Sequence, residues 1–224
     1  MNASPQSLAG LAGRTFAAVI FDMDGTLVDS RAVIQRSWTV WARRYGVPAD
    51  EFHNFHGMPS TAIIAQLIPE ADRDAAKALI DELEENDVEG VVALPGAVDA
   101  LSALDDARRA VCTSAHRALL DARMLAGGLP HPRVVVTVED VTHGKPHPEP
   151  FLLAAERLGH DPANCLVVED ATAGVQAAKA AGCAALAVVT TTARERLQEA
   201  DAIVESLDLV RFVQHADGVR VELA

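Results

Sequence analysis

Short runs of apolar residues alternate with segments of helical spacing along most of this chain, and this alternation constrains its fold more than any other feature. The runs that suit buried strands are residues 17–21, 110–113, 134–138, 165–168, 184–189 and 202–204. Helical patterns separate them at residues 96–104, 117–126, 148–158, 174–181 and 193–200. Continuous apolar strands joined by helices are typical of a parallel sheet that is covered on both faces. The sequence therefore predicts an α/β fold with a doubly wound parallel sheet.

One region, residues 30–94, interrupts this alternation because it contains helical patterns and no convincing strand. Helices are expected at residues 31–45, 60–67 and 71–84. Ser30 is a plausible N-cap for the first of them, and Gly46 is a plausible end. We therefore expect an inserted α-helical cap domain, residues 30–94, and a core domain made of residues 1–29 and 95–224.

Composition argues against several classes of function. The 224 residues carry a formal net charge of -13, which makes the protein a poor candidate for binding nucleic acid or an anionic membrane. No apolar run approaches the roughly 20 residues of a membrane span, and the N-terminal segment lacks the basic and apolar regions of a signal peptide. A cytoplasmic protein with no nucleic-acid or membrane partner is expected.

Polar and charged side chains follow four of the predicted strands. These side chains are Asp22 and Asp24, Thr113 and Ser114, Lys145 in the loop after residues 134–138, and Glu169 and Asp170. Ligands of parallel α/β sheets bind beyond the carboxyl ends of the strands, so these four positions are expected to converge on one site.

The carboxylates of this group need a positive charge nearby. At ~4 Å and an effective dielectric constant near 20, two unit charges interact by about 4 kcal/mol, so Asp22, Asp24 and Asp170 together favour a divalent cation or protonation. Hard oxygen ligands suit Mg²⁺. Lys145 adds a fixed cation, and Thr113 adds a hydroxyl. This set suits phosphoryl transfer, in which one carboxylate attacks phosphorus and forms an aspartyl phosphate while a second transfers protons.

The motifs DMDGT, TSA, GKPHPEP and VVEDATAG occur in this order, and through them the chain resembles the haloacid dehalogenase-like phosphatases with a helical cap after the first strand. The resemblance implies that Asp22 is the nucleophile and Asp24 the general acid and base. It implies that Thr113 and Lys145 bind the phosphoryl group. It also implies Mg²⁺ as the cofactor, bound by Asp22, by Asp170 and by the backbone carbonyl of Asp24.

The segments HGMPSTAI, VEGVVALPGA and GLPHPRVVVTVEDVTHGKPHPEPFLLAA are similar to those of the subgroup that dephosphorylates small sugar and polyol phosphates, such as glycerol phosphate. This resemblance implies a small phosphorylated sugar or polyol as the substrate, with contacts from His56 and Glu89 of the cap. The backbone amide of Ser114 is expected at the phosphate. Members with this cap are often monomers, so a monomer is expected.

A phosphosugar mutase of the β-phosphoglucomutase type is the alternative function. That type carries Val where Thr26 stands and His where Ile34 stands, and both departures favour hydrolysis. Lys77, the cap lysine, is interpreted as part of a solvated helix face. Whether Glu169 binds the metal directly is left open, as is whether residues 213–224 pair as an edge strand or fray.

Overall fold

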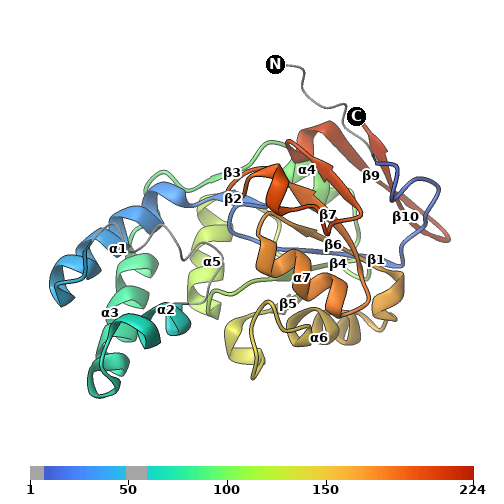
Figure 1. Ribbon diagram of the computed structural model, residues 1–224. Helices are drawn as coiled ribbons and strands as arrows, with labels where there is room; N and C mark the ends of the chain where they lie inside the picture. The colour runs from blue at the N-terminus through green and yellow to red at the C-terminus, as the bar shows by residue number, and fades with distance from the viewer. Residues whose placement is uncertain (1–7, 49–59) are drawn as a thin grey trace.

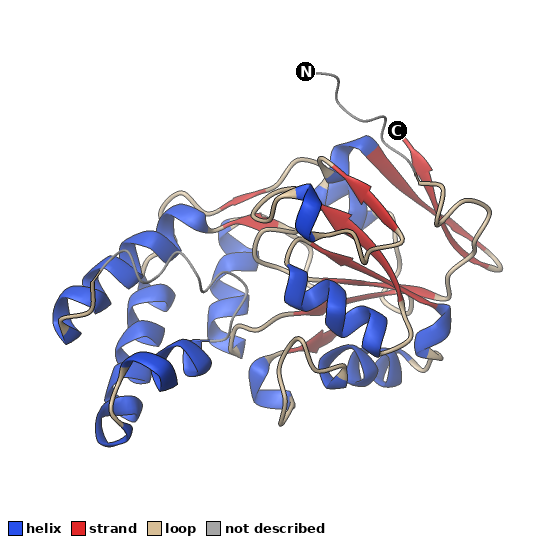
Figure 2. Ribbon diagram, in the orientation of Figure 1, coloured by secondary structure: helices blue, strands red, loops and turns tan. Residues whose placement is uncertain are grey.

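The computed structural model describes residues 8–48 and 60–224, and within these ranges its centre is a six-stranded parallel sheet (Figures 1 and 2). The strands lie in the order β5–β4–β1–β6–β7–β8. Their bounds are β1 (Ala18–Phe21), β4 (Arg109–Cys112), β5 (Val134–Val136), β6 (Cys165–Glu169), β7 (Ala184–Val188) and β8 (Ala202–Val204). The predicted α/β fold is confirmed, and each predicted strand lies close to its expected bounds.

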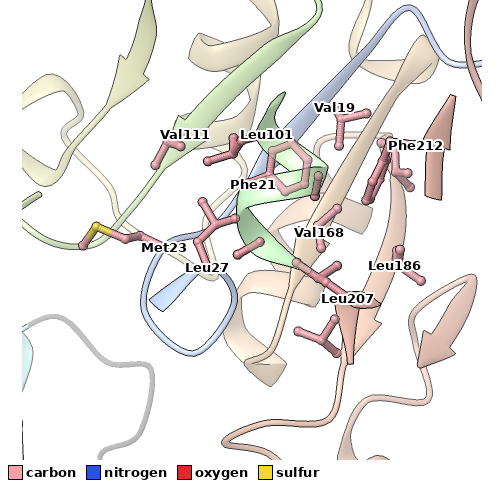
Figure 3. Packing of buried hydrophobic residues seen from close by; sticks show 14 of the residues in the cluster. Val19, Phe21, Met23, Leu27, Leu101, Val111, Val168, Leu186, Leu207 and Phe212 are labelled. Carbon is pink, nitrogen blue, oxygen red and sulfur yellow. The ribbon is translucent and has the colours of Figure 1, made fainter. Parts of the chain in front are cut away.

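Helices cover both faces of this sheet, as the apolar strands require. The helices of the core are α4 (Ala97–Ser102), α5 (Arg117–Ala126), α6 (Glu149–Leu158) and α7 (Thr172–Ala180). Successive residues of β1 point to opposite faces: Val19 and Phe21 pack with α4 and α5, while Ala18 and Ile20 pack with α6 and α7. Figure 3 shows the first of these two layers, with Phe21 at its centre.

The C-terminal residues form an antiparallel hairpin of β9 (Val210–His215) and β10 (Gly218–Leu223). Of the two outcomes left open for this segment, pairing is therefore the one found, with β9 rather than with the main sheet. Phe212 of β9 packs edge-on against Phe21 at 5.4 Å between ring centroids, which places the hairpin over the layer that contains α4 (Figures 1 and 3). The hairpin thus covers the part of this same sheet face that α4 and α5 leave open.

The helix expected at residues 193–200 is a wrong prediction, because the structure has only a short 3-10 helix there, Arg194–Arg196. The hydroxyl of Thr172 donates to the carbonyl of Arg196 (3.2 Å) and occupies an oxygen that a longer helix would use. The amide of Asp201 already donates to Ala185 of β7 (2.9 Å). The chain has returned to the sheet before a longer helix can form.

In the described part of the inserted segment, the helices are α1 (Arg31–Tyr45), α2 (Ser60–Leu67) and α3 (Arg73–Asn86), with a short 3-10 helix, Glu70–Asp72, before α3. These helices have a hydrophobic cluster of their own, which includes Trp38, Trp41 and Ile80. Trp41 also donates its indole N–H to the carbonyl of Ala76 (2.7 Å), which ties α1 to α3. We refer to residues 30–94 as the cap, and we propose that it is a domain distinct from the core.

The ends of α1 agree only in part with the sequence. Gly46 adopts a left-handed conformation (φ 66°) and ends α1 as expected. Ser30 does not cap α1 with its side chain. Its hydroxyl donates instead to Asp24 (2.6 Å), a stronger partner because a carboxylate carries a full charge.

The two connections between core and cap pair with each other. The short strand β2 (Val28–Asp29) lies antiparallel to β3 (Val92–Ala93), so a strand does exist inside the region that was expected to have none. A two-residue strand is too short to show a period, which is why the sequence does not reveal it. Within the described ranges, no helix is long and apolar enough to cross a bilayer.

We expect the return from the cap to the core to depend on Gly96. Its φ is +81°, and a Cβ there would lie 2.3 Å from the backbone nitrogen of Asp208. Gly128 has a similar φ of +63° but open space around it. Urea denaturation should show a loss of about 1 kcal/mol for Gly128→Ala, from backbone strain alone, and of about 2 to 4 kcal/mol for Gly96→Ala. Equal losses in the two variants would mean that the close approach at Gly96 does not matter.

Candidate active site

The carboxyl ends of four neighbouring strands meet the cap at one cavity, whose volume is about 660 Å³. This volume lies within the range of small-molecule sites. Among the sequence-predicted site residues, those that line the cavity are Asp22, Asp24, Thr113, Ser114, Lys145 and Asp170. Since they come from separate strand ends, the parallel sheet is what gathers them.

Lys145 is the centre of the buried part of this site. Its ammonium donates to Asp22 (2.6 Å), to Glu169 (2.7 Å) and to the backbone carbonyl of Cys112 (3.1 Å). These contacts use all three of its N–H donors. Asp22 and Lys145 are each only 7% exposed, so water screens the pair weakly.

Burial and charge act in opposite directions on these groups. Burial raises the pKa of Asp22 to about 7, although the nearby Lys145 opposes the shift. Burial likewise raises the pKa of Asp170 well above its usual range, and the charges of Glu169 and Asp22 add to the effect. Burial alone would lower the pKa of Lys145, but Asp22 and Glu169 outweigh it and hold that pKa above its usual value. One lysine therefore does not balance the negative charge of this group of carboxylates.

The donor set fits a hard divalent cation. Carboxylate oxygens of Asp22, Glu169 and Asp170 all lie within 4.8 Å of one another and are buried. Such a group of oxygens, short of positive charge, matches the ligands that Mg²⁺ prefers. Mg²⁺ would be held by Asp22 and Asp170.

Asp170 is fixed by hydroxyl groups and by a close approach of the DMDGT loop. Thr26 donates to one of its oxygens (3.3 Å), and Thr191 donates to the other. Gly25 has a φ of +85°, and a Cβ there would lie 2.2 Å from the Asp170 carboxylate. Only glycine therefore lets this loop approach Asp170.

Glu169 is fully engaged within the protein. One oxygen accepts from Lys145, and the other accepts from the backbone amides of Asp170 (2.9 Å) and Ala171 (2.8 Å). A Cβ at Gly174 would lie 1.7 Å from the same carboxylate, so this glycine makes room for Glu169. These contacts favour a role in positioning Lys145.

The loop after β4 places Thr113 and Ser114 at the cavity. Thr113 is buried, and its hydroxyl accepts from the amide of Ala115 (3.1 Å). Helix α5 is capped by His116, whose Nδ1 accepts from Leu119 (3.4 Å), so neither Thr113 nor Ser114 serves as its cap.

Asp24 has a different environment from Asp22. It accepts from Ser30 (2.6 Å) and lies 2.8 Å from Arg123, a residue of α5. The same guanidinium lies 3.1 Å from Glu84 of the cap helix α3. Arg123 therefore links Asp24 of the DMDGT loop to the cap. Figure 1 shows α5 between the sheet and the cap helices.

Several cavity residues were missed or misinterpreted from the sequence. Lys77 lines the cavity and pairs with Asp81, so its interpretation as part of a solvated face is wrong. Glu84, which also lines the cavity, follows Lys77 and Asp81 at helical spacing and could have been found as the third member of one polar stripe. Arg123 stands within the buried stripe of α5, and a charge in an apolar stripe is a signal in itself.

The two cap residues proposed from the resemblance stay unsupported by the structure. His56 lies outside the described residues. Glu89 is exposed in the turn after α3 and does not line the cavity, and its backbone carbonyl accepts from Arg36 (2.7 Å).

Comparison with known proteins places the chain among enzymes. The family model described as haloacid dehalogenase-like hydrolase matches residues 16–182. Hexitol phosphatase A of Escherichia coli (strain K12) is 40% identical over 205 residues, which cover 89% of this chain and 95% of that protein. Glycerol-1-phosphate phosphohydrolase 1 of Saccharomyces cerevisiae is 34% identical over 222 residues, covering 92% of this chain and 89% of that protein.

Solved structures agree with this placement. A hydrolase from Pseudomonas syringae superposes with a TM-score of 0.78 at 27% identity, covering 86% of this chain and 95% of that chain. The resemblance inferred from the four motifs is thus confirmed over most of the chain.

We expect Mg²⁺ to stabilise the folded protein through Asp170. At a pH between the usual pKa of Asp22 and its raised pKa of about 7, Asp22 is protonated in the folded state and ionised in the unfolded state. That proton competes with the metal, so Mg²⁺ should raise Tm more at about pH 8 than at about pH 5. Asp170→Asn should abolish the rise at both pH values. An equal rise in wild type and variant, measured by thermal denaturation, would place the metal elsewhere.

Proposed function

The chain belongs to the haloacid dehalogenase-like hydrolases, and from this premise we propose that it is a Mg²⁺-dependent phosphatase acting on a small sugar or polyol phosphate. The observation that carries the proposal is the convergence of Asp22, Lys145 and Asp170 at one buried sheet edge, with Asp24 beside them. We propose that the reaction proceeds through a phosphoenzyme formed on Asp22.

The substrate class follows from the relatives and from the cavity. The relatives described above are named as phosphatases of a hexitol phosphate and of glycerol 1-phosphate. The cavity has room for a molecule of this size. Its cap wall combines the apolar side chains of Ile34, Trp38 and Ile63 with polar ones: Gln35, Thr39, Ser60, Thr61, Lys77, Asp81 and Glu84. Such a wall suits a hydroxylated substrate.

The phosphoryl group binds at the sheet edge. Lys145 supplies a cation 2.6 Å from the attacking carboxylate, and the loop after β4 offers the hydroxyl of Thr113 and the backbone amide of Ser114 to the phosphoryl oxygens. Mg²⁺, which Asp22 and Asp170 would hold, would supply positive charge that lets an anionic nucleophile approach an anionic phosphate. Positioning and charge neutralisation are the main sources of catalysis in phosphoryl transfer.

Asp22 then attacks phosphorus. The carboxylate is reactive only when ionised, and its raised pKa means that burial disfavours this form. The contact with Lys145 offsets part of that effect. The bond between phosphorus and the ester oxygen breaks as the bond to the Asp22 oxygen forms, and Asp24, which enters the cycle protonated, gives its proton to the departing alcohol.

Water completes the cycle from the side that the alcohol has left. Asp24 takes a proton from the water, whose oxygen attacks phosphorus and releases phosphate and the free Asp22 carboxylate. Ser30 orients Asp24 through its 2.6 Å hydrogen bond. Each group thus ends the cycle in its starting state.

Hydrolysis is favoured over the phosphosugar mutase alternative. Thr26 donates to Asp170, and Ile34 lines the cavity, so the two positions at which the mutase type differs both lie at or beside the site. A mutase would interconvert glucose 1-phosphate and glucose 6-phosphate faster than it releases phosphate.

We expect free phosphate to be released from a panel of small monoesters with Mg²⁺: glycerol 1-phosphate, the hexitol phosphates and the glucose phosphates. Asp22→Asn removes the nucleophile and should reduce kcat by at least about 10⁴-fold on every substrate. Lys179→Met, at an exposed ion pair remote from the cavity, is the control and should behave as wild type. Comparable rates for Asp22→Asn and wild type would refute the mechanism.

The role of Asp24 makes its importance depend on the leaving group. An alkyl alcohol is a poor leaving group and needs a proton, whereas p-nitrophenolate leaves without one. Asp24→Asn should therefore slow phosphoenzyme formation by about 10²- to 10⁴-fold with glycerol 1-phosphate and far less with p-nitrophenyl phosphate. Rapid-mixing experiments should then show a burst of p-nitrophenol, because the second step still lacks its base. Equal slowing of both substrates in the first turnover would contradict this role.

A further inference from the structure

Arg123 and Glu84 form a largely buried ion pair beside Asp24, the residue to which the proposed function assigns protonation of the leaving alcohol. Arg123 is 2% exposed, and the side chain of Glu84 is 13% exposed. One edge of the guanidinium lies 2.8 Å from Asp24 and another part lies 3.1 Å from Glu84. Glu84 is thus one guanidinium width from Asp24, whose protonated carboxyl group gives its proton to the ester oxygen under the proposed function. A group on the next carbon of the substrate comes within reach of this pair.

The pair also has unused hydrogen-bonding capacity. Within the part of the chain that the structure describes, Arg123 Nε is buried and has no hydrogen-bond partner. Buried donors without a partner are rare and unfavourable, so an additional acceptor is expected at this position. Arg123 donates to Oε2 of Glu84, so Oε1 can accept a hydrogen bond from a ligand. Burial raises the pKa of Glu84, although the charge of Arg123 opposes the shift. Donor and acceptor lie side by side, as recognition of a hydroxyl group requires.

The charges of the surrounding wall indicate what kind of group binds there. On the cap side of the cavity, Lys77 pairs with Asp81, and Arg123 pairs with both Asp24 and Glu84. Arg31, a further cation of this wall, pairs with Asp29. Each of these cations is therefore already paired with a carboxylate, and a second phosphate or a carboxylate of the substrate would find no unpaired positive charge among these described residues. A neutral hydroxyl, which both accepts and donates, suits the pair.

We propose that Glu84 and Arg123 determine specificity by binding a hydroxyl on the carbon next to the phosphate ester. The inference rests on the proposed function and deepens it: the preferred substrates are monoesters of vicinal diols, a class that includes glycerol 1-phosphate and the hexitol phosphates. Neither residue transfers a proton in the proposed reaction. Glu84 comes from the cap and Arg123 from the core, so the hydroxyl is recognised only where cap and core meet.

The test uses two esters that differ by one hydroxyl. Glycerol 1-phosphate carries the neighbouring hydroxyl, and 3-hydroxypropyl phosphate lacks it. Wild type should prefer glycerol 1-phosphate by about 10- to 100-fold in kcat/KM, as expected for a hydrogen bond to charged groups. Glu84→Met, which keeps the side-chain length and removes the acceptor, should reduce this preference at least about 5-fold. Glu82→Met is the matched control, since Glu82 is an exposed residue of α3 outside the cavity, and it should keep the preference.

The ratio of the two kcat/KM values separates recognition from a structural role. A structural defect slows both esters by the same factor and leaves the ratio unchanged, which would overturn the proposal. If Glu84→Met does not fold, as judged by circular dichroism, Glu84→Gln decides: it retains an acceptor but not the charge, and a reduced ratio is expected. An unchanged ratio in a folded Glu84→Gln would then overturn the proposal.

Failure of the proposed function gives a different result. If wild type releases phosphate from neither ester nor from any other monoester of the panel, the phosphatase assignment falls and this inference falls with it. If wild type hydrolyses both esters with equal kcat/KM, the phosphatase assignment stands and the vicinal-diol preference is refuted.

Discussion

The buried contact between Lys145 and two carboxylates is the interaction on which the rest of the site depends. Lys145 reaches Asp22, Glu169 and the end of β4 at once, so a single side chain ties together elements that lie far apart in sequence. Removing one partner of a buried ion pair typically costs about 3 to 5 kcal/mol, because the other charge is left without compensation. The glycines of the site serve the same arrangement. Gly174 leaves space for Glu169, and Gly25 leaves space for Asp170.

The negative charge that Lys145 does not balance gives the site its chemistry. Asp22 and Asp170 are buried with raised pKa values, so a cation or a proton must accompany them. A phosphate substrate and its metal bring opposite charges into this place together. The second half of the site is built differently: Asp24 is held by Ser30 and by Arg123, which reaches the cap through Glu84. Binding of the phosphoryl group is thus a property of the core, whereas selection of the alcohol involves the cap.

Much of the core could be predicted from the sequence, because buried parallel strands consist of continuous apolar runs. Polar residues directly after such a run mark the carboxyl end of the strand, where ligands bind. Asp22, Thr113, Lys145 and Asp170 were predicted in this way, and the cavity gathers them. The cap wall was harder to predict. A helix carries Lys77, Asp81 and Glu84 on one face, but only packing decides whether that face meets water or a cavity.

Tertiary contacts also explain the other differences. Ser30 was expected to cap α1, and a carboxylate six residues earlier takes its hydroxyl instead. Residues 193–200 have helical spacing, yet a hydroxyl from α7 occupies the carbonyl of Arg196. Glu89 was proposed through resemblance alone and lies exposed, away from the cavity. For Ser30 and for residues 193–200, the deciding partner lies outside the local helical pattern and is brought into contact by the fold, so no local rule identifies it.

The central claim is that phosphate passes through Asp22 on its way to water. The stereochemical course at phosphorus tests it most directly, with a phosphorothioate monoester made chiral by two oxygen isotopes and hydrolysed in water that carries the third, so that the thiophosphate product is itself chiral. Two successive in-line displacements, first by Asp22 and then by water, each invert the configuration, so the account predicts overall retention. Overall inversion would mean that water attacks the substrate directly, and it would contradict a phosphoenzyme on Asp22.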